Sequence, residues 1–484
     1  MGTRPLHPVD LLLLLVGLAH LPGCARSVAT MDSARQAFAV GDLTTASVTL
    51  NEVASDSSQM RDAVELDLAI IELASGNPSA SERRLRAMRD RFDAAPKINP
   101  LSETASVLTD DNAKFFRPAG YEEVMIRTML ALCSLAGDQI DAESYTLQAI
   151  NRQTKLASRA NKHGLDGGNI YQPIAIAPYL RGVLREATHH DYDDASRYYQ
   201  LASAVRPEFT AAVTDIARSK SGTHSRQGNG VLYVISCVGR GPILRETVAP
   251  TTTATLAIAS SVLNSATNQT DNHDDDGAAD EDGHANDEDL PALPNIASVK
   301  VPEVFIPESP VASVGIMVNG NPAGKTETLT NVAELAIRQN TAEMPWTIAR
   351  AVVRRVTKEA AVASLGDAMG LEGTAGSLFH FATASAWSGM EKADTRCWGL
   401  LPREIQVLRT ELPAGPHNVQ IMPLGYAGNA LSNGVQESVT ISNGRNQYLI
   451  VMAPSSQMHV VHRPTTLHDE QKNTNKPLVF SMSD

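Results

Sequence analysis

Residues 230–239 read GVLYVISCVG, a run of apolar and β-branched side chains that is typical of a buried β-strand. Before this run, from about Met31 to Ile216, apolar residues recur at helical spacing. After it, extended segments alternate with two helical ones. We therefore predict a multidomain protein, in which an N-terminal all-α region of helical repeats precedes an α+β domain with a mostly antiparallel sheet.

The helical region, 25–218, contains a recurring turn that joins two helical runs. The turns read GDLTTA (41–46), GNPSAS (76–81), GDQIDA (137–142) and HDYDDA (190–195). The first two are 35 residues apart, close to the tetratricopeptide period of 34. The unit DYDDASRYYQLASAVRPEF, including Ala204 and Pro207, also resembles a tetratricopeptide repeat. This pattern predicts a solenoid with a concave surface for peptides or partner proteins. The alternative is a helical domain whose grooves contact only its own chain.

The C-terminal half is expected to begin after a polar linker at 219–229 and to extend over 230–455. Residues at about 250–292 have too few apolar groups to form a core, so we expect a disordered acidic insertion there. We also expect a disordered tail at 456–484. Two segments, 404–424 and 437–454, have the alternation and turn residues of β-hairpins.

The N-terminus resembles an export signal. A nine-residue apolar run, Leu11 to Ala19, is too short to span a bilayer and is followed by LPGC at 21–24. This tetrapeptide is similar to the lipobox of bacterial lipoproteins, so residues 1–24 are interpreted as a signal peptide with lipid attachment at Cys24. Cleavage after Ser27-Val28-Ala29, without lipid, and a cytoplasmic chain remain alternatives.

The formal net charge of −13 is concentrated in residues 271–289, which carry ten acidic and no basic side chains, so the rest of the chain totals −3. Without a basic excess, nucleic acid is not expected as a partner. The acidic run does not complete an EF-hand-like loop in either of its two registers. It is interpreted as a solvated loop, with weak binding of divalent cations as the alternative, and no metal site or cofactor is expected.

Three cysteines follow Cys24 in the sequence. Cys133 lies in an apolar helical run and is expected to be buried. A disulfide between Cys237 and Cys397 is possible in an oxidising compartment.

The loop VNGNPAGKTE at 318–327 resembles a phosphate-binding loop. That motif needs four residues before its Gly-Lys, whereas three separate Gly320 from Gly324, and Pro322 supplies no N–H. Nucleotide binding is therefore not expected. We predict a surface turn between a strand and a helix, with Lys325 in solvent.

Two further patterns are candidate sites. Arg350, Arg354 and Lys358 recur every fourth residue of a predicted helix, either as a solvated edge or as a basic docking surface. Asp394, Arg396 and Trp398 lie within five residues and can form either a structural corner or a ligand site.

No sequence motif for catalysis is present. His459 and His462 are three residues apart, which in a strand places them on opposite faces. The chain contains neither a Gly-x-Ser-x-Gly elbow nor a His-Glu-x-x-His motif. We therefore do not expect an enzyme.

Taken together, the lipobox, the repeat at 191–207, the strand at 230–239, the helix at 344–359 and the run at 393–421 resemble a family of uncharacterised bacterial lipoproteins. The resemblance covers most of residues 21–425. It implies an envelope location and a non-catalytic role. Ala25, which follows the lipobox cysteine, is not acidic, and in lipoproteins that resemble this one such a residue favours the outer membrane, here facing the periplasm. Our leading hypothesis is a lipid-anchored scaffold that binds envelope proteins. The alternatives are a periplasmic binding module for peptidoglycan, glycan or a divalent cation, and an unrecognised hydrolase.

Overall fold

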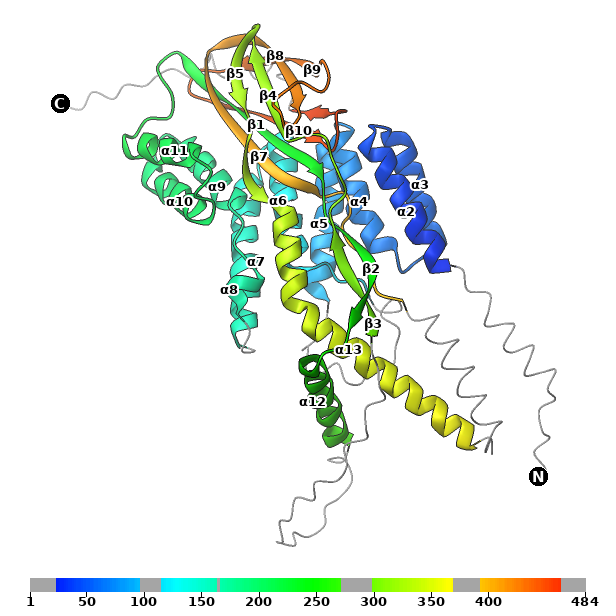
Figure 1. The fold of residues 1–484 in the computed structure, drawn as a ribbon. Coiled ribbons are helices and arrows are strands. Elements are labelled where there is room, and N and C mark those ends of the chain that lie inside the picture. The colour runs from blue at the N-terminus through cyan, green and yellow to red at the C-terminus, as the bar shows by residue number, and fades with distance from the viewer. Residues whose placement is uncertain (1–22, 96–114, 163–165, 271–297, 369–391, 463–484) are drawn as a thin grey trace.

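The computed structural model describes residues 23–95, 115–162, 166–270, 298–368 and 392–462, and helices fill the first half of this part (Figure 1). They are α2 (Gly23–Ala39), α3 (Leu43–Asp56), α4 (Arg61–Ala74), α5 (Pro78–Ala94), α6 (Gly120–Ala136), α7 (Ala142–Lys162), α8 (Gly167–Ile170), α9 (Ile176–Glu186), α10 (Tyr192–Val205) and α11 (Ala211–Lys220). Successive long helices pack against one another as an array.

The predicted turns between helices have clear local causes. Gly41 adopts a φ of 86°, which ends α2, and Asp42 then caps α3 by accepting a hydrogen bond from the Thr45 N–H at 3.0 Å. Gly182 lets α9 approach α10 closely, since a Cβ at this position would lie 2.8 Å from the Tyr199 ring. Small residues at the helix crossings therefore set the spacing of the array.

The strands form three sheets. The strands are β1 (Asn229–Arg240), β2 (Ile243–Pro250), β3 (Ser298–Phe305), β4 (Ser313–Val318), β5 (Asn321–Lys325), β6 (Glu327–Asn331), β7 (Pro402–Pro413), β8 (Gly415–Leu424), β9 (Val435–Ile441), β10 (Asn446–Ala453) and β11 (His459–Val461). The larger sheets have the orders β11-β10-β1-β7-β6 and β5-β4-β8-β9, and β2 pairs with β3. Among the described strands β1 and β10 pair in parallel and the other pairs are antiparallel.

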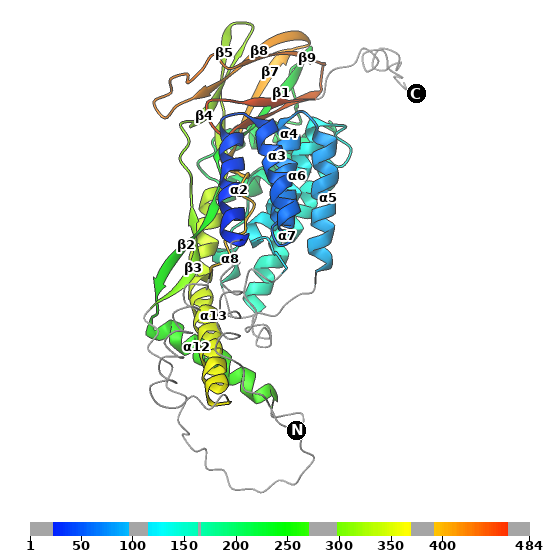
Figure 2. The same ribbon diagram turned by 90° about the vertical axis from the view of Figure 1, so that its right-hand side faces the viewer.

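Strand β1 lies in the middle of the molecule and is buried on both faces. Tyr233 and Ile235 face a core shared with the helices, while Leu232 and Val234 face a second core shared with the four-stranded sheet. The layers are therefore helices, five-stranded sheet and four-stranded sheet, with the sheets at one end of the helical array (Figure 2). The predicted order, helices first and sheets afterwards, is confirmed.

The two predicted hairpins are wrong, although their strands exist. β7 pairs with β1 and β6, whereas β8 pairs with β4 and β9, so the chain crosses between sheets at Ala414. The Asn443-Gly444 turn likewise carries the chain from β9 in one sheet to β10 in the other. Both pairs of strands place apolar side chains in the core between the sheets. The same alternation therefore fits a crossing as well as a hairpin.

The loop at 318–327 is part of a hairpin between β4 and β5. Asn319 and Gly320 have φ values of 52° and 80°, as a two-residue hairpin turn requires. The turn and the exposure of Lys325 agree with the prediction. The helix does not follow directly, however, because β6 comes first and leads into α13 (Val332–Ala368).

The expected linker, insertion and tail contain ordered residues. His224, in the segment 219–229, is 2% exposed, and the Arg226 N–H donates to Glu411 at 2.9 Å. Part of the predicted insertion forms the helix α12 (Thr253–Thr270), and its acidic run lies outside the described residues. The predicted tail begins with β11, and residues 463–484 are also outside the described part. Because the helices and the five-stranded sheet share one core, the two predicted domains are packed as one unit.

Helices α12 and α13 and the ribbon β2–β3 extend beside the helical array, away from the larger sheets (Figures 1 and 2). They are held by a small core that includes Val299, Ile348 and Val352. We call these four elements the arm.

Candidate functional site

A groove with a volume of about 210 Å³ lies where the end of the helical array meets the edge of the five-stranded sheet. Four segments line this groove: 172–175 before α9, 205–208 after α10, 329–331 in β6, and Glu334, Leu335 and Arg338 in α13. We refer to it as the edge groove. It is the candidate site because charged side chains from distant parts of the chain meet there around open space.

The wall formed by α13 follows from how that helix begins. The Asn331 side chain, at the end of β6, accepts a hydrogen bond from the Glu334 N–H at 3.0 Å. This cap starts α13 directly at the end of the strand. Glu334 and Arg338 are then one helical turn apart, and they form an ion pair of 2.7 Å.

The opposite wall forms where α10 ends. Arg206 is the C-cap of α10, with its N–H donating to the Ala202 carbonyl at 2.9 Å, and Pro207 prevents the helix from continuing. The helix end thus presents Arg206 and Glu208 to the groove. Below them, the Ile176 N–H at the start of α9 donates to Thr330 Oγ1 of β6 at 3.0 Å.

The charges in the edge groove are only loosely paired across it. The Arg206 guanidinium lies 3.5 Å from Glu334 and 3.4 Å from Glu208. The 3.4 Å distance is measured from Arg206 Nε, which is buried and makes no hydrogen bond in the described part of the chain. Charge-assisted hydrogen bonds are typically 2.7–2.9 Å, so both ion pairs of Arg206 are loose.

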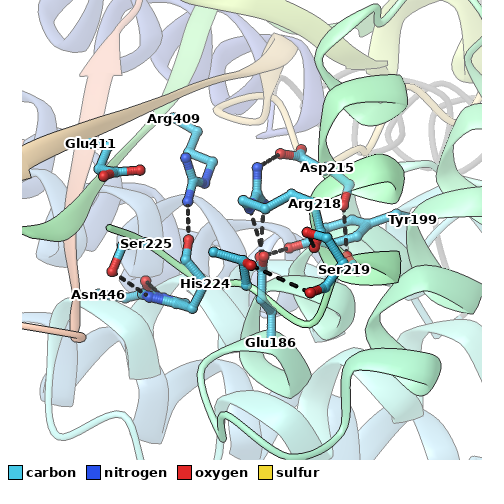
Figure 3. A network of polar contacts seen from close by, with 12 residues as sticks. Glu186, Tyr199, Asp215, Arg218, Ser219, His224, Ser225, Arg409, Glu411 and Asn446 are labelled. Atoms are coloured by element: carbon cyan, nitrogen blue, oxygen red, sulfur yellow. Dashed lines mark hydrogen bonds and ion pairs between the residues drawn. The ribbon is translucent and has the colours of Figure 1, made fainter. Parts of the chain in front are cut away.

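A second polar cluster, which we call the buried network, fastens α9–α11 to the sheet (Figure 3). Glu186, which is 0% exposed, accepts hydrogen bonds from Tyr199 Oη at 2.7 Å and from Arg218 Nε at 2.6 Å. Asp215 accepts from Arg218 Nη1 at 2.6 Å and from Tyr179 Oη at 2.8 Å. Burial raises the pKa of Asp215 and of both tyrosines.

The buried network continues into the sheet. Arg409 of β7 donates to the His224 carbonyl at 2.6 Å, and the His224 ring contacts Asn446 Oδ1 at 2.8 Å. Burial lowers the pKa of His224. Because Glu186 and Asp215 are at most 2% exposed, a substrate has no access to them, and the network joins α9, α10 and α11.

The predicted corner brings Asp394, Arg396 and Trp398 against the helices. Arg396 pairs with both Asp394 oxygens, at 2.8 and 2.6 Å, and donates to the Gln59 carbonyl at 3.1 Å. Trp398 is fully buried, and its backbone N–H donates to Glu122 at 2.8 Å. These contacts correspond to the structural interpretation of this run.

Two buried carboxylates hold the corner. Besides Trp398, Glu122 accepts the Ala119 N–H at 2.8 Å, and Asp67 accepts the Leu400 N–H at 2.9 Å. Burial raises the pKa of Glu122 to about 7 and also raises the pKa of Asp67. Arg35 pairs with Asp67 at 3.2 Å.

The basic residues of α13 do not form one exposed stripe. Arg350 is exposed, whereas Arg354 is 6% exposed, and the side chain at Lys358 lies outside the described part. The neighbouring residues Val352 and Val353 belong to the core of the arm. The expected docking surface is therefore not continuous.

The three cysteines after Cys24 are buried thiols, and His462 near the C-terminus lies beside a carboxylate. Cys133, Cys237 and Cys397 are free and buried, which raises the pKa of each to about 12, so the alternative disulfide is not formed. Within the described ranges no group of three or more His, Cys, Asp or Glu could hold a metal ion. His462 instead lies 3.2 Å from Glu437.

Of the predicted signal peptide at 1–24, the structure describes only the last two residues. Residues 1–22 are outside the described part, and Cys24 is the second residue of α2, with a side chain that is not described. None of the helices in the described ranges has the length and apolar character needed to cross a membrane.

No protein-family model, curated protein or solved structure matches the chain.

Sequence reasoning did not find the edge groove. Its two helical segments lie more than 100 positions before β6 and α13, and the predicted turn at 318–327 included only the first residue of β6. The available signal was Pro207, which marks the end of α10 beside Arg206.

Proposed function

We propose that the protein is a scaffold of the bacterial cell envelope, lipid-anchored at Cys24 in the outer membrane and facing the periplasm, which binds protein partners without catalysis. The observation that carries the binding role is the edge groove, where the loosely paired Arg206 lies beside Glu334 and Arg338. The non-catalytic role is supported by the burial of the other charged clusters, whose groups are engaged with each other.

A tetratricopeptide-like array is supported by the packing of α9 and α10. The repeat motif has a small residue followed four positions later by an aromatic one, and later a proline. Ala195, Tyr199 and Pro207 have this order, and the first two are 0% exposed. Gly182 lies against the Tyr199 ring, as expected for closely packed helix pairs.

The anchor is supported by the lipobox-like sequence and by the position of α2. The start of α2 lies at the end of the array that is far from the four-stranded sheet (Figure 2). A lipid at Cys24 would therefore attach the molecule by the opposite end from that sheet. Such tethering raises the concentration of a bound partner near the membrane.

The test combines lipid labelling with crosslinking. We expect palmitate to label the wild-type protein and not Cys24→Ala, and crosslinking in the envelope fraction to recover a protein partner. Equal labelling of the two proteins, or none, would remove the anchor. Recovery of no protein partner would remove the scaffold role and favour a binding module for glycan.

A further inference from the structure

Two histidine rings meet where the helical array joins the sheets. His189 lies in the turn between α9 and α10, His224 lies in the segment before β1, and their ring centroids are 4.8 Å apart. The two rings differ in solvent access, because His224 is 2% exposed whereas His189 is exposed. We call this contact the histidine junction.

Both rings are hydrogen-bonded to the turn between β9 and β10. His189 Nε2 donates to the Gly444 carbonyl at 2.7 Å. Asn446 Nδ2 donates to Tyr448 Oη at 3.0 Å, which leaves Asn446 Oδ1 to accept a hydrogen bond. This oxygen lies 2.8 Å from His224 Nε2, which donates to it (Figure 3). The two rings therefore join the α9–α10 turn and the segment before β1 to a single turn between the sheets.

The buried charges beside the junction are balanced while both rings are neutral. Arg409 donates to the His224 carbonyl at 2.6 Å, and Arg218 belongs to the same buried network. Glu186 and Asp215 both pair with Arg218, so two carboxylates face two guanidinium groups. A proton on His224 therefore adds a positive charge that these carboxylates do not neutralise.

The other charged and titratable groups around the junction do not supply this neutralisation. Glu411 of β7 accepts two N–H groups from the segment before β1, at 2.9 and 2.8 Å. Asp191, in the α9–α10 turn, pairs with an arginine of α9 at 3.0 Å. The β9–β10 turn adds Arg445, which is a further cation. Tyr192 and Tyr233 are phenols whose pKa is raised by burial, so both are uncharged.

The hydrogen bonds of His224 fit a neutral ring and a charged ring equally well. Its Nδ1 lies 3.1 Å from Ser225 Oγ, which also lies 3.1 Å from the Asn229 carbonyl oxygen. Ser225 can therefore donate to a neutral ring, or accept from a charged ring while donating to Asn229. The cost of charging His224 is consequently electrostatic. Burial lowers the pKa of His224, and His189 and Arg409 lower it further.

We propose that the histidine junction is an acid-sensitive contact that holds the α9–α10 turn against the sheets. Because the folded state disfavours the charged ring, the junction stabilises the fold fully above about pH 6.5, the ordinary value for histidine. This contribution is lost as the pH falls through the lower pKa of His224 in the folded protein. Since the end of α10 also supplies one wall of the edge groove, acid would loosen that wall. This acid sensitivity is independent of the proposed scaffold role, since it requires neither a partner nor an anchor.

The test is amide exchange of the full-length protein at pH 7.5 and pH 5.5, corrected for the intrinsic exchange rate at each pH. The Gly444 N–H donates to the Asn229 carbonyl at 2.8 Å, and the Val231 N–H donates to the Arg445 carbonyl at 2.9 Å, so both amides report on the junction. We expect protection in residues 224–231 and 443–447 to fall on the order of tenfold at pH 5.5. Protection in α5 should stay constant. Unchanged protection at the junction, or an equal loss in α5, would overturn the proposal.

Variants of the two histidines test whether these rings cause the loss. His224→Gln removes the titrating ring and keeps a side-chain N–H donor. His189→Asn removes the second ring, and asparagine tolerates the φ of 61° found at this position. We expect the acid-induced loss of protection to disappear in His224→Gln and to shrink in His189→Asn.

His190→Asn is the matched control, because His190 is exposed in the same turn and its backbone N–H bonds to Thr188. This variant should lose protection in acid as the wild type does. If His224→Gln keeps the full loss, or if His190→Asn abolishes it, the histidine junction is not the acid-sensitive contact. The wild-type comparison decides the proposal even if a variant does not fold.

Discussion

Two arginines near the opposite ends of α11, Arg218 and Arg206, both pair with carboxylates but differ in burial. In the last turn of α11, Arg218 pairs with Glu186 and Asp215 at 2.6 Å, and both carboxylates are almost fully buried. Before its first turn, Arg206 faces carboxylates at 3.4–3.5 Å in an open groove. Desolvation makes the ion pairs of Arg218 important for the fold, whereas solvent weakens those of Arg206. Burial, rather than residue type, therefore separates structural arginines from candidate binding arginines.

The largest effect is expected from Arg218→Ala. This change leaves Glu186 and Asp215 buried without their counter-charge, so the free energy of unfolding should fall by about 3–5 kcal/mol. Urea unfolding of the purified protein measures this difference. Arg197→Ala, on the exposed surface of α10, should change it by less than about 0.5 kcal/mol. Near-wild-type stability of Arg218→Ala would contradict the structural role of the buried network.

The buried carboxyl of Glu122 should make the stability of the protein depend on pH. Because its pKa is raised from 4.5 to about 7 in the folded protein, the folded state binds this proton more tightly than the unfolded state does. Its contribution to stability is complete below about pH 4.5 and is lost as the pH rises through about 7. The loss should be on the order of 3 kcal/mol.

Unfolding of the wild type and of Glu122→Gln across pH 5–8 isolates this contribution. The wild type should lose stability relative to the variant as the pH rises, because Gln does not titrate. A constant difference between the two proteins over that range would show that burial does not raise the pKa of Glu122.

Gly182→Ala tests whether the helices beside the buried network are packed as closely as in a tetratricopeptide-like repeat. The added Cβ would lie 2.8 Å from the Tyr199 ring, and we expect a loss of about 1–3 kcal/mol in the free energy of unfolding. Gly168→Ala is the control, because its Cβ would meet only an Asp166 oxygen at 3.6 Å. Equal thermal denaturation of both variants would contradict the close crossing of α9 and α10.

The sequence predicted elements that depend on local chemistry. The strand at 230–239 was recognisable because its β-branched run is continuous. The Asp394–Arg396 pair was recognisable because its partners are only two positions apart. The contact between Trp398 and Glu122 was not predictable, since 276 positions separate them. The hairpins were misassigned for a related reason: alternation fixes which face of a strand is buried but not which strand lies beside it.

The edge groove depends entirely on such distant contacts. β6, with the sequence ETLTN, is too short and polar to be distinguished from the end of a turn. Arg206 and Glu334 are 128 positions apart, and the repeat-like motif that contains Arg206 does not indicate a contact with Glu334. Burial of the carboxylates near Arg218 was equally hidden, because it results from how α9–α11 dock on the sheet.

Arg206→Ala is expected to have the smallest effect on stability and so completes the comparison with Arg218. Glu208 is 71% exposed and Glu334 is 36% exposed, so water can solvate both carboxylates once the guanidinium is removed. The free energy of unfolding should therefore change by less than about 1 kcal/mol. Urea unfolding at low and high salt measures this, and the small difference should shrink further with salt because exposed pairs are screened. A loss as large as that of Arg218→Ala would mean that Arg206 is required for the fold, and the distinction between the two ends of α11 would not hold.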